Sequence, residues 1–364
     1  MTGKCCILFS MKFTTRIYSK GRIDRAGKEL ITLADDNPAR EETLNVINNW
    51  RSCHGYPLQI IKMTLLNRAK HIDNAALIAQ RLKRTPSIAI KLKDNPNMKL
   101  SQMQDIGGCR AVMASARELN KLYAAYEKSK SKNPHDRPVW IDTNDYVKQP
   151  KTDGYRSIHL IYKYQSKSES KQPFNGQRIE IQMRSRAQHA WATAVEISQT
   201  FTGQALKSKV KSASEAWLRF FVLMGGAMAL REKCPEVPGV PQNRRELVDE
   251  LKHVASQEKI LELLSGWGQA MQRVEAAAAG SEQFLLVLDP TEKRLQVTPF
   301  AKDQLSLAQE EYLLAEKRAE SDPQIQVVLV SVDSLDDLRK AYPNYYVDTR
   351  VFISAVQRET REGR

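Results

Sequence analysis

The segment Asp145–His159 reads DYVKQPKTDGYRSIH, and Ile179–Arg184, which begins twenty residues after it, reads IEIQMR. The first segment places a glycine-tyrosine-arginine turn between two stretches of strand-forming residues. The second alternates apolar and polar residues, so that Glu180 lies on one face of a predicted strand. Together they predict a mixed sheet that carries a nucleotide site without a Walker-type loop.

The composition is that of a soluble globular protein. With 364 residues, 41% of them hydrophobic and 27% charged, the chain is long enough for about two domains with their own cores. The apolar run Cys5–Met11 is too short to cross a membrane and lacks a cleavage site of small residues, which predicts a cytosolic protein. The five cysteines show no CxxC pair and no histidine at metal-ligand spacing. We therefore expect reduced thiols, with neither a zinc site nor a disulfide framework.

The formal charge of +14 is unevenly distributed. Residues 281–364 carry 11 Lys and Arg against 15 Asp and Glu, a net of −4, which leaves 45 against 27, or +18, for residues 1–280. A single basic cluster is commonly just solvated surface, but the summed field favours nucleotides or RNA as partners. The clusters are Lys128, Lys130, Lys132 and Arg137, and then Lys207, Lys209 and Lys211.

Apolar residues at helical spacing dominate the first third of the chain. We expect helices over residues 22–36, 41–53, 57–70 and 118–129, and at about 186–200, 208–232 and 243–279. Strands are expected at 109–113, 139–147, 157–164 and 177–183. Thr85 followed by Pro86 predicts a helix start with Thr85 as its N-cap, and such a start attracts phosphate groups.

The pattern changes after Gly280, which predicts a helix stop and a domain boundary. We expect strands at 284–288, 294–299, 325–332 and near Val351, with helices at 302–319 and 335–341. Residues 281–364 are thus predicted to be a separate small α/β unit. It would follow an N-terminal helical region (1–75), a core (76–204) and linking helices (205–280).

Two acidic residues are candidates for metal binding and general-base chemistry. Asp105 lies just before the strand that carries Arg110, and Glu180 lies within another strand, so that both can face one cleft. Mg²⁺ prefers one or two carboxylates with phosphate oxygens and water, and attack by a ribose hydroxyl needs a base within reach. Tyr155, after Gly154, offers a flat face for a nucleobase. The alternatives are a solvent-facing Glu180 and a hairpin turn with Tyr155 in the core.

Four motifs in order resemble the synthetase domain of the RelA/SpoT family. They are RLKRTPSIAIKL (81–92), MQDIGGCRAV (103–112), DYVKQPKTDGYRSIH (145–159) and IEIQMRSRAQHAWATAVE (179–196). The resemblance covers residues 80–200 and implies an α+β fold, with a mixed-sheet, nucleotidyltransferase-like core flanked by helices. It also implies transfer of pyrophosphate from ATP to a 3′-hydroxyl. Charge stabilisation by cations should supply much of the rate of such a transfer.

The resemblance assigns roles to individual residues. Arg81 and Arg110 would sandwich the ATP adenine, Asp105 would bind Mg²⁺, and Glu180 would be the second ligand and the base. Tyr155 would stack on the acceptor base. The phosphates would be held by Lys83, Ser87, Lys91 and Lys151, and the acceptor side of the cleft would be lined by Gly154, His159, Gln182, Arg184 and His189. For the two histidines, structural hydrogen bonding is an equal alternative.

The acceptor is less well determined than the chemistry. Asn144 stands where alarmone synthetases often carry Lys, and Asp153 where they carry Asn, which argues against GDP or GTP. One branch of the family modifies the 3′ CCA end of tRNA, an acceptor that suits the basic part of the chain. The (p)ppGpp synthetase reading and a non-catalytic nucleotide- or RNA-binding module remain as alternatives. The His135-Asp136 dipeptide lies in a polar loop, so we expect no hydrolase site there.

The acidic tail, residues 281–364, resembles the antitoxin-like domain of CapRel-type fused toxin–antitoxin proteins, including a zinc-finger-like outline without metal ligands. In those proteins a YxxY pair, here Tyr342 and Tyr345 with Tyr346 adjacent, covers the adenine site. The resemblance implies an autoinhibited enzyme that a phage protein, such as a capsid component, activates through the tail. The alternative is that these tyrosines belong to the core of the tail.

Overall fold

The computed structural model describes residues 13–361, apart from 35, 131–137, 206–210, 271, 276–280, 320, 321, 323 and 333. Its helices are α1 (Lys20–Thr32), α2 (Ala39–Ser52), α3 (Gly55–Ile72), α4 (Thr85–Asp94), α5 (Ala116–Lys130), α6 (Arg186–Ala205), α7 (Lys211–Arg231), α8 (Arg244–Gln257), α9 (Ile260–Ala270), α10 (Leu305–Ala319), α11 (Leu335–Ala341) and α12 (Arg350–Arg361). Its strands are β1 (Leu77–Leu82), β2 (Gly107–Met113), β3 (Val139–Asp145), β4 (Ile158–Lys163), β5 (Arg178–Ser185), β6 (Gln272–Glu275), β7 (Ser281–Asp289), β8 (Arg294–Ala301) and β9 (Gln326–Ser331).

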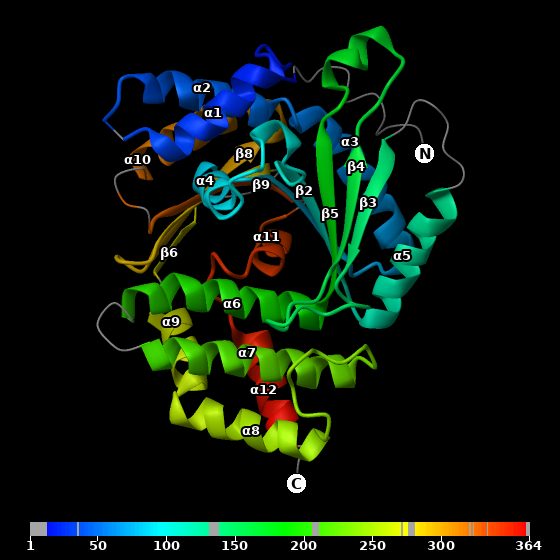
Figure 1. Ribbon diagram of the computed structural model, residues 1–364, viewed down its shortest axis with the longest axis vertical. Coiled ribbons are helices and arrows are strands. Elements are labelled where there is room, and N and C mark those ends of the chain that lie inside the picture. Colours follow the sequence, from blue (N-terminus) through cyan, green and yellow to red (C-terminus); the bar gives the residue numbers. More distant parts are fainter. Residues whose placement is uncertain are drawn as a thin grey trace.

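One mixed sheet runs through the molecule (Figure 1). Within the described residues its strand order is β3-β4-β5-β2-β1-β9-β7-β8-β6. The β2–β5 and β6–β8 pairs are parallel, and the other pairs are antiparallel. These elements confirm the expected α+β fold with a mixed sheet flanked by helices.

Alternation along the strands gives the sheet two different faces. Ile179, Ile181 and Met183 of β5 pack with α3 and α5 in one apolar cluster. Their neighbours on the same strand, Glu180, Gln182 and Arg184, point to the opposite face, on the side of α6. The polar residues of the opening motif are therefore gathered on one face because the apolar half of the same strand fills the core.

The tail strands join the core sheet. β9 pairs with β1 through Gln80↔Ser331 and Arg81↔Val330, and β7 continues the sheet beyond β9. The separate α/β unit expected after residue 280 is therefore an extension of the core sheet. The boundary at Gly280 lies outside the described residues. In sequence, β1 gives no clear strand signal, since LIAQRL mixes apolar residues with Gln80 and Arg81.

A layer of helices, made of α7, α8, α9 and α12, packs below α6 (Figure 1). In this layer α12 of the tail packs with helices that precede residue 280. The helix expected at 243–279 is in fact α8 and α9, separated by Glu258 and Lys259, and strand β6 follows. Lys259 has φ +48°, a left-handed conformation that ends a helix. The strand expected near Val351 is also wrong. The β-branched residues there belong to α12, which buries Phe352 and Val356 against α6, α8 and α9.

Phe352 tests this packing. Its side chain is 1% exposed, and its ring centroid lies 5.8 Å from that of Phe221 and 6.1 Å from that of Phe220. Phe352→Ala should lower the free energy of unfolding by about 3–5 kcal/mol, measured by urea unfolding. Val351→Ala is the control, because Val351 is 63% exposed and its loss should cost under about 0.5 kcal/mol. Equal effects of the two changes would show that α12 is not packed as described.

Candidate active site

Four neighbouring strands, β4, β5, β2 and β1, bring the polar candidates together on the α6 face. Arg110 of β2 is in register with Gln182 of β5, and Gln182 is in register with His159 of β4. Arg81 of β1 lies two positions along from the partner of Arg110 and shares its face. Because in-register side chains on one face of a sheet are neighbours, the motifs meet in space as expected.

A hydrogen-bonded chain links Glu180 to the glycine-tyrosine turn. Glu180 Oε1 accepts from His159 Nδ1 at 2.9 Å, and His159 Nε2 lies 2.8 Å from the Tyr155 hydroxyl. Arg184 donates to the same hydroxyl at 2.8 Å, and Gln182 donates to Glu180 Oε2 at 2.7 Å. Donors from two side chains thus hold both carboxylate oxygens of Glu180 in place.

The charges of this chain follow from its contacts. Burial raises the pKa of Glu180, but the bonds from His159 and Gln182 and the His159 charge outweigh it and lower that pKa. Burial likewise lowers the pKa of His159, yet its bonds to Glu180 and Tyr155 raise it overall. For Tyr155, burial is outweighed by Arg184 and His159, which lower its pKa to about 8. These shifts favour the ionised form of Glu180 and the protonated form of His159.

Asp105 lies two residues before β2, close enough for its charge to act on Glu180. Its two oxygens accept from Lys83 Nζ and Lys91 Nζ, each at 2.9 Å. Burial raises its pKa, but the two lysine charges outweigh burial and lower it, while the Asp105 charge itself works against ionisation of Glu180. Two adjacent carboxylates beside lysines suit Mg²⁺ shared with phosphate oxygens and water, so the residue types fit that ion.

The start of α4 differs from the expected cap. The N-cap is Arg84 and makes no side-chain cap bond, while Thr85 is already helical. The Thr85 hydroxyl instead accepts from Arg51 at 3.0 Å. Ser87 is half-buried on the first turn of α4. Lys151 is exposed, with its ammonium 4.6 Å from the Tyr146 ring and 5.4 Å from the Tyr155 ring.

Gly154 fits a turn that only glycine can form. Its φ is +90°, and an added Cβ would lie 3.1 Å from the Phe221 carbonyl oxygen and 3.1 Å from the Trp191 ring. The facing residue, Gly225 of α7, approaches just as closely, since its Cβ would lie 2.9 Å from the Gly154 oxygen. The turn before Tyr155 is therefore pressed against α7. Tyr155 also contacts the core, as the alternative expectation had it, since its ring packs edge-on against Trp191.

The tail covers the arginine end of this face. The Tyr342 ring centroid lies 5.8 Å from the Arg110 guanidinium, and Arg110 Nη1 donates to the Ala341 carbonyl at 3.3 Å. His189 Nε2 donates to the Lys340 carbonyl at 3.3 Å, and the Tyr342 hydroxyl donates to the Gln80 carbonyl at 3.3 Å. The tail tyrosines Tyr342, Tyr345 and Tyr346 are all buried and belong to one apolar cluster with both core and tail residues.

Several polar atoms under the tail lack hydrogen-bond partners. Among the described residues they include Arg110 Nε, Arg184 Nε, His189 Nδ1 and the Tyr345 hydroxyl. Burial, with the charges of Arg184 and Arg81, lowers the pKa of Arg110 to about 10, and burial lowers that of His189 well below its usual value. Buried guanidinium groups on a sheet face whose Nε atoms lack acceptors are typical of a site that accepts an anionic or aromatic ligand.

Sequence reasoning missed two buried ion pairs that position the site. Arg156 pairs with Glu232 at 2.7 Å, next to the tyrosine turn, and Arg51 pairs with Glu316 of the tail at 2.8 Å. The partners lie far apart in sequence and share no motif, so no local signal could have found them. The dipeptide His135-Asp136 and the basic residues Lys132, Arg137, Lys207 and Lys209 lie outside the described residues.

The shifted pKa of Tyr155 gives a prediction about titration. Because its folded pKa is near 8 and its unfolded value is 10, ionisation of Tyr155 should stabilise the fold increasingly as pH rises between them. An ultraviolet difference titration should show one tyrosinate step near pH 8 that Tyr155→Phe removes. Tyr162→Phe is the control, because burial raises the pKa of Tyr162 to about 12. Persistence of the step in Tyr155→Phe would show that the network is not formed.

Comparison with known proteins gives three findings. Residues 80–203 match a family described as "Region found in RelA / SpoT proteins". No curated protein matches the chain. Solved structures similar to it include the small alarmone synthetase 1 from Bacillus subtilis bound to its product pppGpp, with 17% identity over 59% of this chain and 94% of that chain and a TM-score of 0.34.

Two further solved structures are also similar to the chain. The small alarmone synthetase 2 from Bacillus subtilis has 18% identity over 50% of this chain and 93% of that chain, with a TM-score of 0.38. A GTP pyrophosphokinase family protein from Streptococcus pneumoniae has 19% identity over 49% of this chain and 85% of that chain, with a TM-score of 0.34. The family match contains the four motifs and bears out the RelA/SpoT region expected at their positions.

Proposed function

We propose that the chain transfers pyrophosphate from ATP to a 3′-hydroxyl and that its tail holds it inactive. The observation that carries the proposal is Tyr342 packed against Arg110, beside Arg81. In the transfer, the 3′-oxygen attacks the β-phosphorus of ATP, the bond to the α-phosphate oxygen breaks, and AMP leaves. The proton of the 3′-hydroxyl passes to Glu180.

The residues of the site suit each part of this step. Glu180 is ionised and held in place by His159, so it can accept the proton. Arg81 and Arg110, once uncovered, offer two flat cations for an adenine. Lys83 and Lys91 can neutralise transferred phosphates once they leave Asp105, and Mg²⁺ at Asp105 and Glu180 would neutralise the polyphosphate charge. Tyr155 and Arg184 remain on the acceptor side.

Autoinhibition follows from the same contacts. An adenine between Arg81 and Arg110 needs the space beside Arg110 that Tyr342 fills. Tyr345 is 0% exposed, and its hydroxyl and that of Tyr342 both act to raise the pKa of Arg81. Within the described residues β9 pairs with β1 at two positions, so local release of this pairing leaves β1 paired along its length with β2. A phage protein that binds the released tail would shift this equilibrium towards the active form.

For the acceptor we propose the 3′ end of tRNA. The support is the net charge of +18 on residues 1–280, which suits a polyanion larger than a free nucleotide. Asp153 has no weight in this choice, because its oxygen accepts from the Tyr155 N–H at 2.8 Å, a bond that Asn could make equally well. GDP or GTP is therefore the second candidate acceptor.

Tyr342→Ala should activate the enzyme. Loss of the ring removes a cation–π contact and buried apolar area worth about 2–3 kcal/mol, so basal ATP-dependent transfer should rise tenfold or more. Tyr342→Phe is the matched control, because it keeps the ring and loses only the 3.3 Å bond to Gln80. Transfer is measured as release of labelled AMP from α-labelled ATP. Equal basal rates for both variants and the native chain would contradict inhibition by Tyr342.

A label-transfer assay identifies the acceptor. The native chain and Tyr342→Ala are incubated with γ-labelled ATP and tRNA, GDP or GTP, with and without phage lysate. We expect label to appear on tRNA. In reactions of the native chain, we expect labelled tRNA only when lysate is present. Label on GDP or GTP alone would show that the chain is a (p)ppGpp synthetase. If no acceptor gained label, the chain would be a non-catalytic binding module.

A further inference from the structure

Arg51 is a buried cation outside the site described above. Its side chain is 2% exposed, and its Nη1 lies 2.8 Å from Glu316 Oε2 while Nη2 lies 3.4 Å from Oε1. Nη2 also donates to the Tyr312 hydroxyl, and the Tyr312 ring centroid lies 5.1 Å from the guanidinium. Both partners belong to α10, so the tail presents a carboxylate to a cation of the core.

The carboxylate of Glu316 lies at the start of α4 as well. Thr85, the first residue of this ten-residue helix, donates to Glu316 from its backbone N–H and from its hydroxyl, each at 3.3 Å. The first N–H groups of a helix lack helical acceptors and carry partial positive charge. Glu316 is thus held by an arginine fork, a hydroxyl and a helix start, the donor set that also binds phosphate.

The core builds this donor set without help from the tail. Arg51 Nε donates to the Lys83 carbonyl at 2.9 Å, and Nη1 donates to Asn48 Oδ1 at 2.9 Å, which fixes the guanidinium. When α10 leaves, these bonds remain, but Arg51 loses the only carboxylate bonded to it among the described residues. A buried cation without a counter-charge is costly, so the emptied site favours another anion.

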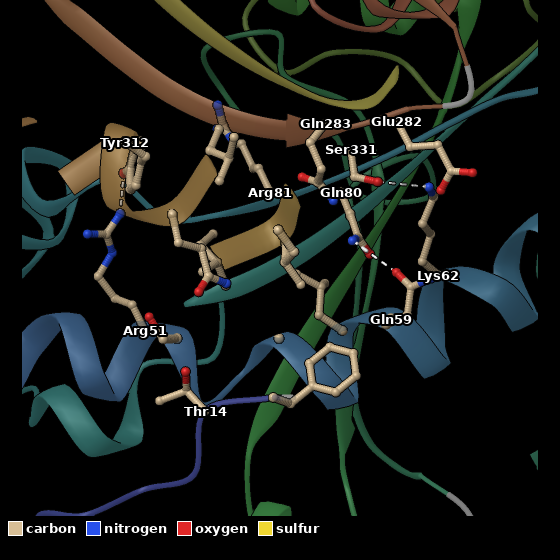
Figure 2. A pocket seen from close by; sticks show the side chains of 18 of the residues that line it. Thr14, Arg51, Gln59, Lys62, Gln80, Arg81, Glu282, Gln283, Tyr312 and Ser331 are labelled. Atoms are coloured by element: carbon tan, nitrogen blue, oxygen red, sulfur yellow. Dashed lines mark hydrogen bonds between the residues drawn. The ribbon is translucent and has the colours of Figure 1, made fainter. Parts of the chain in front are cut away.

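Access to this position is visible in the structure. Arg51 and Tyr312 line a cavity of about 970 Å³ between α3, β1 and α10 (Figure 2). Arg51 also donates to the backbone carbonyl of Lys83, the lysine whose ammonium group bonds Asp105. A phosphate bound at Arg51 would therefore lie at the edge of the candidate active site.

We propose that Arg51, Thr85 and the first turn of α4 form a phosphate-binding site that the Glu316 carboxylate occupies while the tail is docked. The ligand is a phosphate group, either from ATP or from the backbone of an RNA acceptor. The proposal rests on the proposed function in that both substrates carry phosphate. It adds a second anchor for the tail, distinct from the tyrosines, in which a carboxylate takes the place of the substrate anion.

Binding by full-length variants tests the site without requiring turnover. Glu316→Gln removes the stand-in charge, and Glu292→Gln, an exposed position of the tail that does not line the cavity, is the control for the charge change. The double variant Arg51→Gln/Glu316→Gln removes the site cation while replacing the ion pair by two amides, and its fold is checked by thermal melting. The probes are ATP, measured by calorimetry, and a labelled RNA ending in CCA, measured by fluorescence anisotropy.

We expect Glu316→Gln to bind at least one probe tenfold or more tightly than Glu292→Gln, and the double variant to lose that gain. The probe that gains identifies the source of the phosphate. If the folded double variant keeps the gain, Arg51 holds the tail without binding phosphate, and the site is refuted. No gain in Glu316→Gln also refutes it. Failure of the transfer chemistry would appear in the label assay and not in these affinities, so the two proposals fail separately.

Discussion

The arrangement depends on three arginines on one face of a mixed sheet, of which Arg110 and Arg184 are buried and Arg81 is half-buried. Burying cations without carboxylate partners is unfavourable, and burial with the neighbouring charges indeed lowers the pKa of Arg110. Strand alternation forces them onto this face, because the apolar residues of the same strands fill the opposite core. The cations must therefore be covered by something that tolerates them, either aromatic rings or a nucleotide.

The tail supplies such a cover as part of the same sheet. β9 adds to the edge of β1, α11 brings Tyr342 over Arg110, and α10 brings Glu316 to Arg51. Under the proposed function, an aromatic ring of the tail stands where the base would lie and a carboxylate stands where a phosphate would lie. A docked tail and a bound nucleotide would then compete for the same groups, which would be the physical basis of a two-state switch. In the described part of the chain, no helix combines the length and apolar character that a membrane crossing needs.

Local patterns predicted the strands and helices of the core well because their signals are short-range. The alternation in IEIQMR placed Glu180, Gln182 and Arg184 on one face, and register then brought His159 and Arg110 beside them. Long-range pairing was not predictable. β1 lacks a strand pattern, the union of β1 with β9 joins residues about 250 positions apart, and the Arg51–Glu316 pair joins residues 265 apart. At α12, β-branched residues suggested a strand, but packing of Phe352 in the helical layer decided otherwise.

The central claim is that the docked tail and ATP exclude each other at Arg81 and Arg110. Hydrogen–deuterium exchange of the full chain, followed at residues 335–342 while a non-hydrolysable ATP analogue is titrated by calorimetry, tests this directly. We expect amide protection of α11 to fall in proportion to the fraction of chain that has bound the analogue. A chain that is saturated with the analogue while α11 keeps its full protection would contradict the account.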